Sequence, residues 1–151
     1  MRRLAVTSAA FAAALVIGCG DGSSSDGGAV AWDGDPVVVR QPELPDDTTV
    51  SGKIRNDTDA DLALDVADAK VVHEDGTPVR STVTFAEGYA HSLYPPRDAP
   101  KETPRQEAER LGRAVTIKPG KSGHLTVAWR LKPGEAPPVR VDLGDDSLVL
   151  P

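Results

Sequence analysis

The feature that most constrains the fold of this chain is a series of short segments, beyond residue 35, in which apolar residues alternate with polar or small ones. Such alternation places every second side chain on one face, so each segment is predicted to be a half-buried strand. Turn-forming Pro, Gly, Asn and Asp residues separate the segments. Strands are predicted at residues 37–39, 50–55, 62–66, 69–72, 79–85, 114–117, 125–131, 139–143 and 147–150, with a bulge or bend at Ala67-Asp68.

About eight short strands, with turns every 8–12 residues, are typical of an all-β sandwich. One segment departs from the pattern. Thr103-Pro104-Arg105-Gln106 has the form of a helix capping box with Pro at the first helical position, and Gly112 is placed to end the helix. We therefore predict one helix of about two turns in a connection between sheets, with a loop of mixed charge as the alternative.

The composition limits the class of protein. The net charge of −6 argues against a nucleic-acid binder, and the single cysteine excludes an internal disulfide and a thiolate-rich metal site. Aromatic residues are only 4% of the chain, so the core is expected to depend on Val, Leu and Ile. Trp129 alternates in step with the apolar residues of segment 125–131 and is expected to face that core. Trp32, among small and acidic residues near the start of the domain, is expected to matter less.

The N-terminal end has the pattern of an export signal. Two arginines precede residues 4–17, fourteen uncharged residues that fit the apolar part of a signal peptide and are short for a membrane span. The segment ends in Val16-Ile17-Gly18-Cys19, which resembles the lipobox of bacterial lipoproteins. The resemblance implies that residues 1–18 are removed and that Cys19 receives a diacylglyceryl group. A secreted protein with an incidental thiol is the alternative.

A lipid on Cys19 would hold the protein at the extracytoplasmic face of the cell membrane, because two or more acyl chains give stable attachment. Residues 19–28 are the lipidated cysteine and a segment, residues 20–28, that contains only Gly, Ser and Asp and is predicted to be a flexible tether. The remaining residues 29–151 are predicted to form one domain, with no apolar run near the length of a membrane span. Removal of residues 1–18 changes the net charge from −6 to −8, so anionic lipid would repel this domain.

Three strand patterns together carry a resemblance to a known family. They are the segment from Val50 to Asn56 with the aliphatic strand that follows it, the strand entered through Pro119-Gly120 and ending in Trp129, and the charge-flanked strand at 139–143. This combination resembles an extracellular immunoglobulin-like family of unknown function that many Gram-positive and actinobacterial lipoproteins carry. The resemblance covers about residues 45–150. It implies an immunoglobulin-like β-sandwich outside the membrane and supplies no catalytic residues.

One aspartate-rich turn has part of the pattern of a calcium site. Asp57, Asp59 and Asp61 alternate like the first half of an EF-hand loop. That loop requires Gly at its sixth position and Glu at its twelfth, which are Leu62 and Asp68 here. A solvated turn is therefore the favoured interpretation, because Asp tolerates turn conformations, and a weak calcium site stays open as the alternative.

Other signs of metal binding or catalysis are weak. The three histidines, His73, His91 and His124, lack the close spacing of a zinc site and are expected at the surface or at strand ends. No Gly-x-Ser-x-Gly motif is present, and no spacing supports a pair of catalytic carboxylates. We therefore expect a protein that is not an enzyme and holds no metal or cofactor.

One loop concentrates residues that are enriched at contact surfaces, with both tyrosines and a diproline between residues 87 and 97. Its candidate contact residues are Tyr89, His91, Tyr94 and Arg97; in the alternative, the tyrosines cover one end of the sandwich. The leading hypothesis is a lipid-anchored, non-catalytic binding module for an envelope protein or a small ligand. The competing hypothesis is a ligand- or metal-binding lipoprotein accessory to a transporter.

Overall fold

The computed structural model describes residues 28–86 and 100–151, and within them the chain forms ten strands, one α-helix and one short 3-10 helix. The strands are β1 (Val30–Trp32), β2 (Val37–Gln41), β3 (Leu44–Asn56), β4 (Leu62–Asp65), β5 (Ala69–Val72), β6 (Ser81–Thr84), β7 (Ala114–Ile117), β8 (Ser122–Arg130), β9 (Arg140–Leu143) and β10 (Asp146–Val149). The helices are η1 (Val66–Asp68) and α1 (Pro104–Arg110). Every segment in which alternation predicts a strand contains one.

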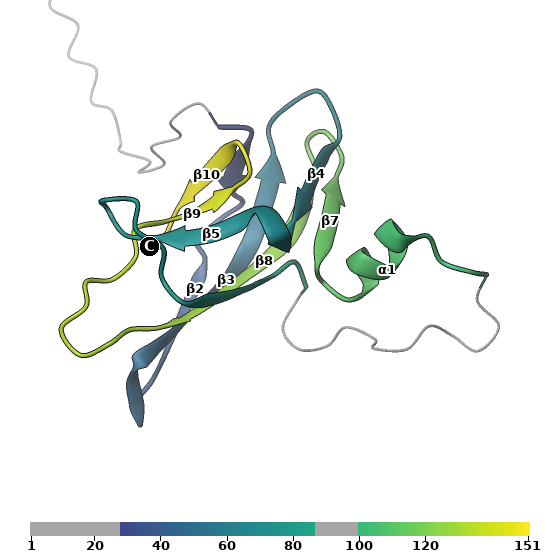
Figure 1. Ribbon diagram of the computed structural model, residues 1–151. Coiled ribbons are helices and arrows are strands. Elements are labelled where there is room, and N and C mark those ends of the chain that lie inside the picture. The colour runs from purple at the N-terminus through teal and green to yellow at the C-terminus, as the bar shows by residue number, and fades with distance from the viewer. Residues whose placement is uncertain (1–27, 87–99) are drawn as a thin grey trace, which may run out of the picture.

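All strand pairs are antiparallel, and the strands form three sheets. The largest sheet has the order β1-β3-β8-β6, with β2 also paired to β3. The smaller sheets are β10-β9-β5 and β4-β7. Figure 1 shows the β10-β9-β5 sheet lying over the large sheet, and α1 standing beside β7. The predicted all-β sandwich with one short helix in a connection is confirmed.

The core between the sheets is built from aliphatic side chains, as the composition predicts. The aliphatic residues with no exposed surface come from both layers: Val50, Ile54, Leu125 and Val127 in the large sheet, and Val71 and Val141 in the three-stranded sheet. Trp129 joins them with 8% of its surface exposed, so the predicted register of its strand is confirmed. The opposite face of the large sheet, called the outer face below, carries the alternate residues of β3 and β8.

The capping signals place α1 as predicted. The Thr103 hydroxyl accepts a hydrogen bond from the Gln106 amide, and the Gln106 side chain accepts one from the Thr103 amide at 2.9 Å. Gly112 follows the helix with a φ of +66°, a left-handed conformation that favours glycine. A Cβ there would lie 2.7 Å from the Thr84 hydroxyl, so both the backbone and the space select glycine.

Two features of the fold differ from the predictions. The interruption at Ala67-Asp68 is neither a bulge nor a simple bend, because η1 occupies it and the Asp65 carboxylate caps it by accepting from the Ala67 amide at 2.9 Å. Trp32 lies in an additional strand, β1, and packs against the core. Its indole Nε1 donates to the Val149 carbonyl at 2.7 Å, so Trp32 is part of the sandwich and joins the two layers.

The described chain begins at one end of the sandwich, and the surface depressions lie at the other. Trp32 pairs with Ile54 near the end of β3, whereas Asp47 pairs with Arg130 near its start. At about 3.3 Å per residue, Asp47 and Ile54 are about 23 Å apart. The end marked by Asp47, the β2–β3 turn and the loops at residues 73–80 and 131–139 is called the distal end; Figure 1 shows the β2–β3 hairpin projecting from it. Among the described residues, no helix has the length and apolar character needed to cross a membrane.

Candidate functional site

Several residues singled out by the sequence lie outside the described part of the chain. They are Cys19, with the signal peptide and most of the tether, and the four contact candidates Tyr89, His91, Tyr94 and Arg97. Their predicted roles therefore stay predictions. The structure instead draws attention to three surfaces at or near the distal end, which are built from residues that the sequence does not place together.

The first surface is a depression of about 700 Å³, called the distal groove. It spans the ends of β3, β8 and β6: part of its lining is on the outer face, where Thr49 and Thr82 both pair with Ala128, and part comes from Thr48, Ser81 and Trp129 on the opposite face. The small side chains on the outer face leave a shallow floor. Arg80, Arg130 and Lys132 line the groove together with Asp47 and Glu135, so three cations meet two carboxylates in a chain whose net charge is −6.

Arg130 is committed to a partner within the groove. Its Nε donates to Asp47 Oδ1, and its Nη2 donates to Asp47 Oδ2 at 2.6 Å, a two-bond pairing across β3 and β8. These hydrogen bonds lower the pKa of the Asp47 carboxyl and raise the pKa of the Arg130 guanidinium. Among the described residues, neither Arg80 nor Lys132 has a side-chain hydrogen bond or an ion pair. Arg80 and Lys132 are therefore the groove cations without a hydrogen-bonded partner, although the charge of Lys132 also helps to lower the pKa of Glu135.

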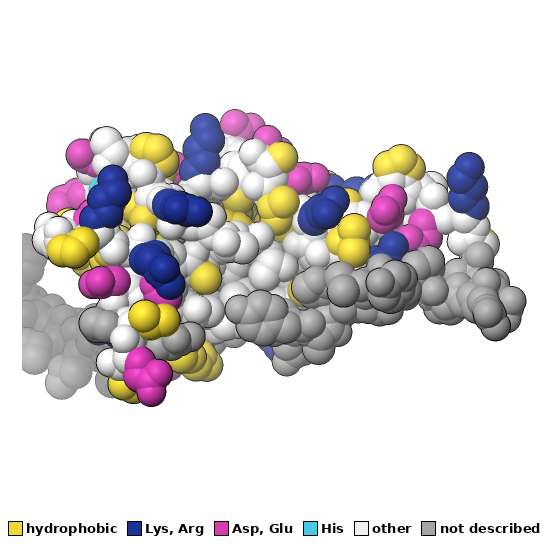
Figure 2. Space-filling model, turned by 60° about the horizontal axis from the view of Figure 1, so that its bottom comes forward, with side chains coloured by type: hydrophobic (Ala, Val, Ile, Leu, Met, Phe, Trp, Pro, Cys, Tyr) yellow, Lys and Arg dark blue, Asp and Glu magenta, His cyan; other side chains and the backbone are white. Residues whose placement is uncertain are grey.

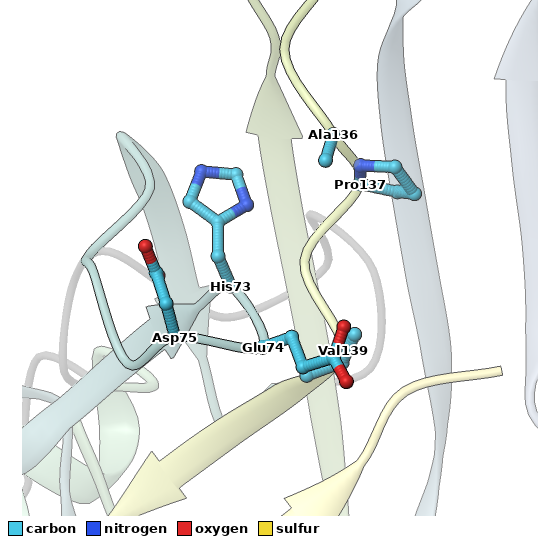
Figure 3. A pocket seen from close by; sticks show the side chains of 6 residues that line it. All are labelled: His73, Glu74, Asp75, Ala136, Pro137 and Val139. Carbon is cyan, nitrogen blue, oxygen red and sulfur yellow. The ribbon is translucent and has the colours of Figure 1, made fainter.

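The second surface is a smaller depression of about 450 Å³ beside the groove, between the loops at residues 73–80 and 131–139. Figure 3 shows the His73 ring between Asp75 on one side and Ala136 and Pro137 on the other. The His73 Nε2 lies 3.2 Å from Glu135 Oε1 and so joins the two loops. The Lys132 amide donates to the other oxygen of Glu135 at 2.7 Å, and this bond, followed by that of His73, lowers the pKa of the Glu135 carboxyl.

The third surface is the free edge of β2. This strand pairs with β3 alone, so among the described residues its other edge has no strand partner. Val37 and Val39 stand on the outer face with 63% and 51% of their surfaces exposed, and Val38 and Leu44 are exposed as well. Four of the six exposed large hydrophobic residues in the described chain thus belong to one hairpin. Figure 2, which turns the distal end toward the viewer, shows hydrophobic and basic side chains close together.

The aspartate turn is organised by an asparagine, which sequence reasoning took only as a turn signal. Asn56 is fully buried, and its side chain donates to the carbonyls of Ala60 at 2.7 Å and Ile117 at 2.8 Å. Its Oδ1 accepts from the Thr58 amide and hydroxyl at 2.9 and 2.7 Å. The first of the three aspartates, Asp57, pairs with Arg55 at 2.6 Å. In the described part of the chain, no three His, Cys, Asp or Glu residues gather in a way that could hold a metal ion.

A polar cluster on the outer face was also missed by sequence reasoning. The Ser51 hydroxyl lies 2.9 Å from His124 Nε2 and 2.9 Å from the Thr126 hydroxyl. The register of β3 with β8 explains the contact, because Ser51 pairs with Thr126 and Lys53 with His124. No described carboxylate contacts the His124 ring to orient it as a base, so the cluster satisfies the polar groups of two strands rather than forming a triad. His124 is half-buried and is the third residue of β8.

Comparison with known proteins gives this chain no relatives: no family model matches it, and searches of curated proteins and of solved structures found no match.

Proposed function

We propose that this chain is a lipid-anchored lipoprotein of the cell envelope whose immunoglobulin-like β-sandwich is a non-catalytic binding module. The anchoring half of the proposal rests on the lipobox pattern at Cys19, the apolar segment before it and the Gly, Ser and Asp tether after it. Since the described domain begins at the β1 end, the tether from a lipid at Cys19 would join the domain at the end opposite the distal end.

The observation that carries the binding half is the free, valine-rich edge of β2. Proteins usually protect edge strands with charges, bulges or a covering segment, because an open edge pairs readily with other chains. Among the residues that the structure describes, nothing pairs with this edge, which carries Val37, Val38 and Val39 with exposed fractions of 63%, 40% and 51%. An extended segment added to this edge would satisfy the free backbone groups of β2 and cover these valines.

The size of the edge indicates the kind of partner. β2 has five residues and is about 17 Å long. Pairing along so short an edge covers much less than the ~800 Å² of surface that each partner buries in a stable complex of two rigid domains. An extended segment of another envelope protein fits better, because it can also follow the outer face. Arg40, which has no ion pair among the described residues, lies beside the three valines. The partner segment is therefore expected to be apolar, with a carboxylate near Arg40.

Two variants test this function. The tagged full chain is cross-linked in membranes of the cells that make it and then purified in detergent. Val39→Asp places a charge on the β2 edge, and Val149→Asp places the same charge on β10 at a valine with 64% exposure. The proposal predicts one cross-linked adduct that is present in the wild type and in Val149→Asp and is lost in Val39→Asp. An adduct that persists in Val39→Asp, or no adduct in the wild type, would overturn it.

A further inference from the structure

We propose that the distal groove is a second, independent binding site, which takes a carboxylate-bearing peptide segment through Arg80 and Lys132. The site does not depend on the β2 edge, since its cations come from the start of β6 and the end of β8. Its occupant is inferred from the charges, the floor and the size of the groove.

Some charged side chains of the groove are held by hydrogen bonds to other residues, and some are not. Asp47 and Arg130 neutralise one another through two hydrogen bonds. Glu135 is shared between the His73 ring and the Lys132 amide, which occupy one oxygen each. The side chains of Arg80 and Lys132 make no such contact with any described residue. Glu135 keeps its negative charge, and the charge of Lys132 helps to lower the pKa of this carboxyl. The groove therefore presents Arg80 together with a Lys132 that Glu135 partly balances.

The position of Arg80 strengthens this argument. Ser81 of β6 pairs with Trp129 of β8 in an antiparallel arrangement. The next residues along, Arg80 and Arg130, therefore lie opposite one another at the ends of these strands. Like charges at neighbouring positions of a sheet repel, and Asp47 lies on the far side of Arg130. Asp47 already offsets the charge of Arg130, so an incoming carboxylate would meet mainly the charge of Arg80 here. The folded domain thus leaves one net positive charge in the groove, which a bound carboxylate can balance.

The rest of the groove favours a peptide over a more highly charged ligand. With three cations against two carboxylates, the lining has a net charge of only +1, which suits one or two carboxylates and disfavours a polyanion. The floor offers hydroxyls from Thr49 and Thr82 and the methyl group of Ala128, a mixture that can hold backbone and small side chains. A volume of about 700 Å³ admits a few residues of an extended segment.

The test measures binding of defined peptides to the full chain in detergent by fluorescence anisotropy. One labelled peptide alternates Glu with Val and Thr, and a second has Gln in place of each Glu. We expect the Glu peptide to bind at least about tenfold more tightly, and its affinity to fall with added salt. Arg80→Gln and Lys132→Gln should each weaken it about threefold to fivefold. Lys118→Gln, an exposed cation of the β7–β8 turn at the opposite end, should leave it unchanged.

Four outcomes would overturn the proposal. These are equal binding of the Glu and Gln peptides, unchanged affinity in both Arg80→Gln and Lys132→Gln, competition by free succinate at the same concentration as the peptide, and tighter binding of polyphosphate than of the Glu peptide. Arg80→Gln and Lys132→Gln each replace an exposed side chain that makes no hydrogen bond with a described residue. Circular dichroism should therefore show an unchanged fold in both variants. Val39→Asp tests whether the groove and the β2 edge are separate sites. If they are, this variant should bind the Glu peptide as tightly as the wild type does.

Discussion

Asn56→Ala should be among the most damaging single substitutions in this protein, although asparagine is usually a surface residue. The side chain of Asn56 is fully buried between the β3–β4 loop and the end of β7, and it makes four hydrogen bonds there. Alanine removes all four. The Ala60 carbonyl keeps a bond from the Thr58 hydroxyl at 3.0 Å, but the Ile117 carbonyl loses its side-chain donor in a buried position.

The magnitude follows from the number of bonds. At about 1 kcal/mol for each hydrogen bond, the loss of four costs roughly 3–4 kcal/mol. That is a large part of the total free energy of unfolding, which is about 5–15 kcal/mol for a domain of this kind. With a urea m-value of about 1.5–2 kcal/mol/M, the midpoint of unfolding should fall by about 2 M.

The chain supplies a matched control for this prediction. Asp75 repeats the same local geometry in an exposed turn, where its Oδ1 accepts from the Thr77 amide at 2.9 Å and from the Thr77 hydroxyl at 2.7 Å. Water replaces these bonds when the side chain is removed, so Asp75→Ala should move the urea midpoint much less. If Asn56→Ala and Asp75→Ala lower the midpoint equally, burial of the Asn56 network does not stabilise the fold and the reasoning is refuted.

Three further predictions concern the core, the charges and the anchor. Trp129→Ala should lower the free energy of unfolding by about 3–5 kcal/mol in urea melts. Trp32→Phe removes only the bond to the opposite layer and part of the ring, so it should lower this free energy less. A smaller effect of Trp129→Ala than of Trp32→Phe would contradict the burial of Trp129. Replacing His73 by alanine should raise the pKa of Glu135 toward its ordinary value of 4.5 without reaching it, because the Lys132 amide still donates; carbon-13 titration measures this. Because the pKa of Glu135 is lowered in the fold, the ionised carboxylate stabilises the fold above about pH 4.5, and this stabilisation is lost as the pH falls. The loss should be smaller in His73→Ala. Cys19→Ser should move the protein from the membrane fraction to the soluble or precursor fraction, and unchanged membrane association would refute the lipid anchor.

The sequence predicts most strands because alternation is a local property. It predicts the helix equally well, since Thr103, Gln106 and Gly112 are capping residues whose roles depend on near neighbours. The first half of β3 and all of β1 escaped prediction. Residues 44–49 contain a proline and two aspartates with no apolar alternation, and they are extended because they lie between β2 and β8. Here pairing with other strands overrides local preference.

The candidate surfaces could not be predicted from the sequence for the same physical reason. Arg80 and Lys132 belong to different strand ends, and only the register of β6 with β8 brings them to one groove. The exposed valines of β2 look like core residues in the sequence, because their composition is the same as that of a buried strand. Their exposure follows from the position of β2 at an edge, which pairing decides.

The most direct test of the central claim, that the β2 edge binds a partner in the envelope, is site-specific photo-cross-linking in living cells. A photoreactive amino acid replaces Val39 in one version of the full chain and Val149 in another, two valines of similar exposure on different sheets. The account predicts a single discrete adduct from position 39, none from position 149, and loss of the adduct when Val37→Asp is added to the first version. Adducts of equal yield from both positions, or none from position 39, would contradict it.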